Sequence, residues 1–96
     1  MSYVVKITLD GINAPDRSPE AKAARKETLS SIPGFLGVKP GLTTSYFLWE
    51  TENSANAYAQ HEATDPSIAA SNPVVEVLPL ESTTLTAAEF NNPLGE

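Results

Sequence analysis

Residues 33–62 constrain the fold of this chain more than any other stretch, because they combine two turns, two apolar strands and the start of a helix. Pro33-Gly34 ends a preceding helix, a short apolar strand follows, and Lys39-Pro40-Gly41 turns the chain back. A long apolar and aromatic strand over residues 42–51 then leads to a helix that begins near Ser54. The rest of the chain must pack around this unit.

The flanking segments complete a four-stranded arrangement. Residues 3–9 alternate in the manner of a strand, and Ser18-Pro19 is typical of the first residues of a helix. Residues 74–80 give a last strand, in which Pro79 predicts either a position at the sheet edge or a bulge. The order β-α-β-β-α-β predicts an α+β, ferredoxin-like fold: a four-stranded antiparallel sheet with two helices on one face.

The domain boundaries follow from the same pattern. We expect one domain over residues 1–88 and a flexible tail over residues 89–96. The sequence also allows a further strand over residues 82–87.

Several predicted strands carry large apolar side chains on both faces, although the two helices can cover only one face of the sheet. Residues 42–51, for example, place Phe47 and Trp49 on one face and Tyr46 and Leu48 on the other. We therefore expect the second face to be covered by something outside the chain. A second copy related by a twofold axis is the commonest solution, so the sequence predicts a homodimer packed sheet to sheet.

Composition excludes several classes of function. The chain has no cysteine and one histidine, so we expect no metal site and no thiolate chemistry. All six basic residues precede Glu50, whereas eight acids and no basic residue lie from Glu50 onward. This balance argues against nucleic-acid binding. No apolar run approaches the length of a membrane span, and residues 1–11 do not form a signal peptide, so we expect a cytoplasmic protein with no membrane partner.

The motifs Pro33-Gly34-Phe35-Leu36 and Trp49-Glu50, followed by a helix with alanine, tyrosine and histidine, resemble those of the dimeric α+β barrel superfamily. The closest resemblance is to the antibiotic-biosynthesis-monooxygenase type of domain, over about residues 3–80. The resemblance implies a dimer whose sheets close a shared barrel, with a pocket between sheet and helices. It also implies that no cofactor is needed, because known members include cofactor-independent oxygenases and cyclases of aromatic polyketides.

The resemblance points to particular residues. Trp49 matches the pocket tryptophan of the polyketide-oxidising members, and the cyclases use a histidine with a tyrosine, which His61 could imitate with Tyr58 or Tyr3. His61 is also the one side chain able to transfer protons near neutral pH. The plainer interpretation makes His61 a surface residue near the C-terminal end of its helix.

The residues around Trp49 also allow two interpretations. Phe47 and Ser45 share its face of the strand, so the three could form an aromatic wall with one hydroxyl for a planar ligand. They could equally be ordinary core.

Two functions remain open. The first is a cofactor-free monooxygenase or cyclase acting on an aromatic or polyketide-like molecule, with His61 as catalytic residue. The ligand contacts would come from Trp49, Phe47, Ser45, Tyr58 and Tyr3. The second is a non-catalytic module that binds a small hydrophobic molecule or a partner. Ser45 and Ala55 stand where the oxygenases have an asparagine and a tyrosine, which favours the second function.

Overall fold

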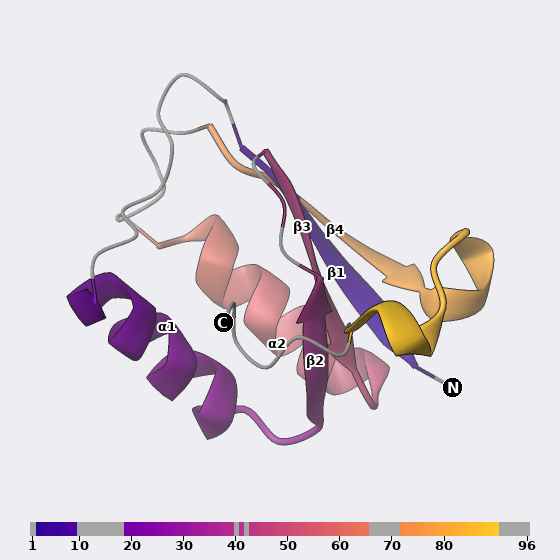
Figure 1. Ribbon diagram of the computed structural model, residues 1–96, viewed down its shortest axis with the longest axis horizontal. Helices are drawn as coiled ribbons and strands as arrows, with labels where there is room; N and C mark the ends of the chain where they lie inside the picture. Colours follow the sequence, from indigo (N-terminus) through magenta and orange to yellow (C-terminus); the bar gives the residue numbers. More distant parts are fainter. Residues whose placement is uncertain (1, 10–18, 40, 42, 66–71, 91–96) are drawn as a thin grey trace.

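The computed structural model describes residues 2–9, 19–39, 41, 43–65 and 72–90. In chain order the elements are β1 (Tyr3–Thr8), α1 (Pro19–Ser31), β2 (Phe35–Lys39), β3 (Thr44–Trp49), α2 (Glu52–Ala63), β4 (Val74–Pro79) and the 3₁₀ turns η2 (Leu80–Ser82) and η3 (Ala87–Phe90) (Figure 1). The described helices include none that is both long enough and apolar enough to cross a membrane.

The four strands form one sheet in the order β2-β3-β1-β4, and every neighbouring pair is antiparallel. Val5 at the centre of β1 lies opposite Phe47 on β3 and Val77 on β4. The predicted α+β class with a four-stranded antiparallel sheet and two helices is confirmed, and the arrangement is compatible with a ferredoxin-like fold. The edge position predicted for the strand that contains Pro79 is also confirmed, because β4 pairs with β1 alone among the described strands.

A small group of hydrogen bonds joins the turn after α1 to the start of α2. Gly34 adopts a left-handed φ of 91°, and its carbonyl accepts a hydrogen bond of 2.8 Å from the Glu50 N–H. The Thr51 hydroxyl oxygen accepts from the Ser54 N–H at 3.2 Å and so caps α2. The Ser54 hydroxyl in turn donates to the Pro33 carbonyl at 2.6 Å. The predicted turn and helix start are thus tied to each other and fix how β3 passes into α2.

One face of the sheet is covered by the two helices. Val5, Phe47 and Trp49 are buried there against Leu29 of α1 and Tyr58 of α2. Among the alanines of the two helices, Ala55 is fully buried, whereas Ala24 and Ala63 are exposed. The strand residues of this main core alternate with residues of the other face, as the sequence predicts.

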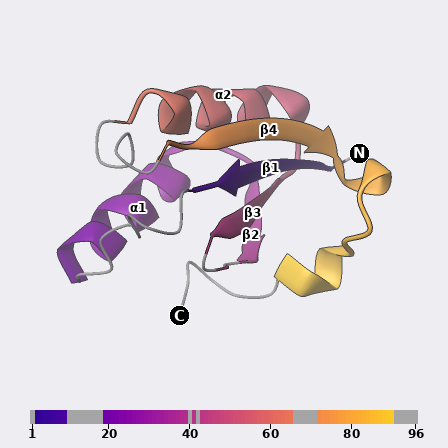
Figure 2. The same cartoon turned by 90° about the horizontal axis from the view of Figure 1, so that it is seen from above.

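The other face, which we call the far face, is partly covered by the C-terminal end of the described chain. Val4 of β1 and Leu48 of β3 are buried beneath Phe90, and Tyr46, Leu80 and Leu85 pack around them. Figure 2 shows η3 and α2 on opposite sides of the sheet. We expected this face to be covered only by something outside the chain. That expectation is wrong for the part of the face around Val4 and Leu48. A few apolar side chains between residues 80 and 90 close it in the same chain.

This segment differs from its expected form. Residues 82–87 form no strand in the described structure; they link η2 to η3. Glu89 and Phe90, where the tail was expected to begin, belong to η3, and residues 91–96 lie outside the described residues.

Candidate functional site

An aromatic cluster occupies the space between the sheet and α2. The ring centroids of Trp49 and Tyr58 lie 5.1 Å apart, and those of Phe47 and Tyr58 lie 4.9 Å apart. Phe35 packs on the other side of Trp49 at 5.1 Å, with its ring tilted by 58°. Centroid distances of this size are those of aromatic pairs in contact. Phe35 is only half-buried, so it lies at the solvent end of the cluster.

The indole N–H of Trp49 is the chemically distinctive atom of this cluster. Trp49 is 0% exposed, and Nε1 has no hydrogen-bond acceptor among the described residues. A buried donor without an acceptor costs about 1–3 kcal/mol, because its hydrogen bond to water is lost on folding and not replaced. Buried polar groups without a partner are rare in native structures, so this N–H calls for an explanation.

The structure brings together most of the predicted aromatic residues. Trp49, Phe47 and Tyr58 are all buried in the cluster, and Tyr3 lies opposite Trp49 in the β1–β3 register and packs against the same core. Ser45 does not join them. It lies opposite Ile7 near the other end of β3, and its Oγ accepts a hydrogen bond of 3.3 Å from the Gly41 N–H.

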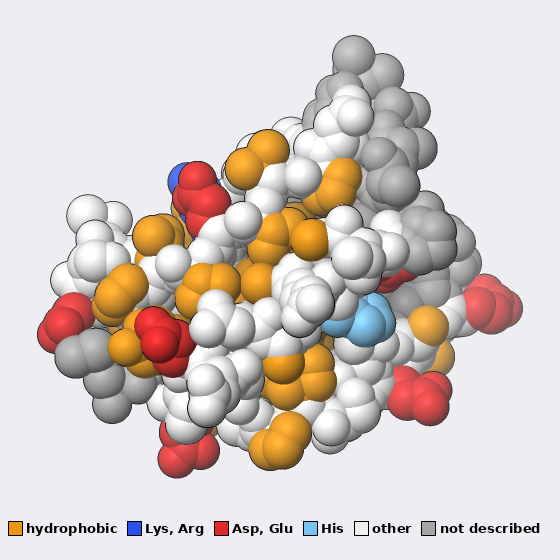
Figure 3. All heavy atoms as spheres, turned by 180° about the vertical axis from the view of Figure 1, so that it is seen from behind, with side chains coloured by type: hydrophobic (Ala, Val, Ile, Leu, Met, Phe, Trp, Pro, Cys, Tyr) orange, Lys and Arg blue, Asp and Glu red, His pale blue; other side chains and the backbone are white. Residues whose placement is uncertain are grey.

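His61 is an exposed residue of α2 (pale blue in Figure 3) that lies one helical turn after the buried Tyr58. Its neighbours are Glu62 and Asp65, and one potential metal-ligand atom from each of the three residues lies within 4.8 Å of the others. Glu62 is buried and Asp65 half-buried, so the group spans the C-terminal end of α2. The three residues lie close together because they follow one another within about one helical turn at the end of α2.

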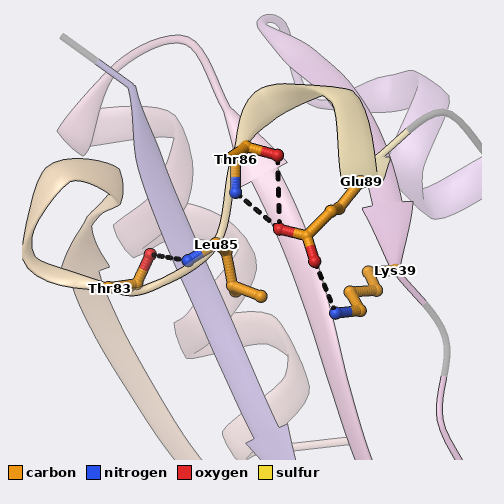
Figure 4. Close-up of polar contacts among 5 residues, drawn as sticks. All are labelled: Lys39, Thr83, Leu85, Thr86 and Glu89. Carbon is orange, nitrogen blue, oxygen red and sulfur yellow. Dashed lines mark hydrogen bonds and ion pairs between the residues drawn. The ribbon is translucent and has the colours of Figure 1, made fainter.

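A second set of contacts lies on the far face and was not predicted. The Lys39 ammonium of β2 binds Glu89 Oε1 at 3.0 Å, and both side chains are more than a third exposed (Figure 4). Glu89 Oε2 accepts hydrogen bonds from the Thr86 N–H at 2.6 Å and the Thr86 hydroxyl at 3.3 Å. The Thr86 N–H, followed by the Lys39 ammonium, holds the pKa of Glu89 below its ordinary value.

The hydrogen bonds between Thr86 and Glu89 could have been predicted from the sequence. Thr86-Ala87-Ala88-Glu89 has the spacing of a capping box, in which a glutamate side chain reaches back to the backbone N–H three residues earlier. The contact of Glu89 with Lys39 joins residues 50 positions apart and has no local signal.

Comparison with models of known protein families gives no match, and comparison with curated proteins gives none either. The resemblance to the dimeric α+β barrel superfamily therefore stays a prediction.

Proposed function

We propose that this protein binds a small, planar, largely apolar molecule that carries one hydrogen-bond acceptor, and that it does so without catalysing a reaction. The observation that carries the proposal is the buried Trp49 Nε1–H, which lacks an acceptor among the described residues. A ligand carbonyl or phenolic oxygen would satisfy this donor. The surrounding rings would contact the faces and edges of the ligand, as in most small-molecule sites.

The ligand would reach Trp49 by displacing Phe35. The rings of the cluster are in contact, so one of them must turn aside for a ligand to enter. Phe35 is the half-buried member and packs directly on Trp49. Its rotation would open the indole to solvent while leaving Tyr58 and α2 in place.

Trp49 is the only tryptophan of the chain, so its fluorescence tests the proposal directly. Titration with a panel of naphthols, quinols and anthrones should give saturable quenching for at least one compound. For that compound, calorimetry on Trp49→Phe should show an affinity about 2- to 12-fold lower, since one net hydrogen bond contributes about 0.5–1.5 kcal/mol. Tyr46→Phe, on the far face, is the matched control and should bind normally. Absence of binding across the panel by folded protein would contradict the proposal.

A cofactor-independent monooxygenase or polyketide cyclase is the second candidate. It is favoured by the same N–H, because a buried donor stabilises the oxyanion that forms when such a substrate loses a proton. It also requires a base beside the substrate, and the exposed position of His61 gives it no support. Oxygen uptake or product formation with the same panel, lost in His61→Ala, would favour the enzyme; turnover unaffected by His61→Ala would remove His61 from the mechanism.

We also propose that two copies of the chain form a dimeric α+β barrel. Part of the far face lies outside the cover of Phe90 and includes Val74, which is 55% exposed and lies opposite Thr8 at the other end of β1. A second copy packed on this part, in a cytoplasmic homodimer, would bury this side chain. Light scattering after size exclusion should then give twice the chain mass, and a monomer at tens of micromolar would contradict it.

A further inference from the structure

The segment from Leu80 to Phe90, which we call the strap, lies across the far face on the side opposite α2 (Figure 2). Its last residue fills an apolar site: Phe90 is 3% exposed and packs on Val4 and Leu48. The floor of the site is a glycine. A Cβ at Gly37 would overlap the carbonyl oxygen of Phe90, so only a residue without a side chain lets the strap come this close.

The same site recognises charge. Glu89 directly precedes Phe90 and binds the Lys39 ammonium at 3.0 Å. Lys39 lies beside Tyr46 in the β2–β3 register, and the same row of the far face continues with Lys6 of β1 and Glu76 of β4, which lie opposite each other. Lys39 is therefore the ammonium of this row that meets the carboxylate of Glu89. A carboxylate next to an aromatic ring is therefore the chemistry that this surface takes.

Most of the described backbone hydrogen bonds of the strap lie within the strap itself. It is joined to the sheet backbone at its first residue, where the Leu80 N–H donates to the Ser2 carbonyl at 2.9 Å. Beyond that point its described backbone bonds are internal, from Thr83 to Leu80 and from Glu89 to Thr86. The Thr83 hydroxyl oxygen also accepts from the Leu85 N–H at 3.1 Å (Figure 4). Side chains hold its far end to β2 and β3, so opening breaks few bonds.

We propose that the far face is a docking site for a short peptide segment in which an acidic residue directly precedes an aromatic one, and that the strap is its resident, intramolecular occupant. The partner is a protein segment with the chemistry of Glu89-Phe90. The strap competes with it at the high effective concentration that a short connection provides, so the site binds in trans when the strap is open.

The test uses full-length protein and a peptide with the sequence of residues 83–90, TTLTAAEF, amidated at its C-terminus. Phe90→Ala removes the occupant and leaves the site intact. Fluorescence anisotropy of the labelled peptide should show binding to Phe90→Ala at least tenfold tighter than to the wild-type chain. NMR shifts should report it at Val4, Leu48 and Lys39. Glu89→Lys, which sets two ammonium groups against each other, opens the strap by a second route and should bind the peptide as well.

Matched controls separate docking from adhesion to an exposed apolar surface. In the Phe90→Ala background, Gly37→Ala should abolish binding, whereas Leu36→Ala, at the neighbouring exposed residue, should leave it unchanged. A peptide with alanine in place of phenylalanine should lose binding. One with glutamine in place of glutamate should bind several-fold more weakly and lose the salt dependence.

Several outcomes would overturn the proposal. These are equal affinity for wild-type and both opened variants, no binding to folded opened variants at millimolar peptide, or a rise in assembly size over wild type in place of peptide binding. Binding of a small molecule at Trp49, on the opposite face, should be the same in wild type and Phe90→Ala. Failure of one proposal therefore leaves the other open.

Discussion

Trp49 shows how a single polar atom changes the energetics of an aromatic core. The indole ring is fully buried and contacts two other rings, which favours the folded state, while its N–H, which has no acceptor among the described residues, opposes it. The residue therefore stabilises the fold less than its buried area suggests. A binding site can exploit this residual cost, because a ligand acceptor removes it.

We expect Trp49→Phe to be mild. Loss of ring volume leaves a small cavity, but removal of an N–H that no described residue accepts offsets about 1–3 kcal/mol of that cost. The net loss in unfolding free energy should stay below about 2 kcal/mol, against about 3–5 kcal/mol for Trp49→Ala. Urea titration followed by circular dichroism measures both. A loss well above about 2 kcal/mol in Trp49→Phe would mean that the N–H is satisfied in solution.

Glu89 gives the strap a dependence on pH. Its pKa is lowered in the folded chain by the Thr86 N–H and the Lys39 ammonium, so the folded state favours the carboxylate. The unfolded state binds more protons between the two pKa values, and the stabilisation is therefore present above the unfolded pKa and lost as the pH falls through the folded one.

NMR titration should show the strap signals of Leu85 and Phe90 shifting with the ionisation of Glu89. In Lys39→Met the pKa of Glu89 should rise toward its ordinary value but stay below it, because the Thr86 hydrogen bond remains. Glu89→Gln should remove this transition. A strap transition unchanged in Glu89→Gln would assign the pH dependence to another group.

At the scale of elements, the predictions that rest on local sequence patterns are correct where the stabilising hydrogen bonds are also local. The predicted turn at Pro33-Gly34 is present, and the helix predicted to begin near Ser54 begins at Glu52 with Thr51 as its cap. Each depends on the φ angle or hydroxyl of a residue at that point. The expected strand over residues 82–87 is absent from the described structure. Its Ser and Thr hydroxyls instead bond to nearby backbone groups and form turns, as Ser82 does with the Pro79 carbonyl at 2.8 Å.

The α2 cap makes a quantitative prediction. Thr51→Ala removes the hydroxyl that accepts from the Ser54 N–H and should lower the unfolding free energy by about 1 kcal/mol. Thr51→Ser keeps the hydroxyl and should be close to wild type. Thermal and urea unfolding of the three proteins provide the comparison; equal stability of the alanine and serine variants would show that the cap does not contribute.

At the scale of the whole molecule, two separate apolar clusters share one thin sheet. The cluster on the helix side uses β strands and both helices, while the far-face cluster depends on one phenylalanine carried by the strap. The two faces therefore differ in how easily they can be exposed, and the strap is the less firmly held cover.

Gly37→Ala should detach the strap as a whole. Its Cβ would meet the Phe90 carbonyl, so we expect the loss of Phe90 burial, about 1.5–3 kcal/mol, and exposure of Val4 and Leu48. Binding of a hydrophobic dye and faster amide exchange at Leu85 would report it. Leu36→Ala, on the same strand but exposed, should change neither. An unchanged dye signal in Gly37→Ala would contradict the close approach.

The sequence by itself determined the α+β class with four strands and two helices, the Pro33-Gly34 turn and a helix start near Ser54, because these depend on residues within a few positions of one another. It also placed Trp49, Phe47 and Tyr58 in one core, since alternation assigns side chains to faces. Only the tertiary structure decided that His61 and Ser45 lie apart from that core and that Phe90 closes the far face. Contacts such as Lys39–Glu89 join segments 50 residues apart, and no local pattern specifies how the chain returns to meet itself.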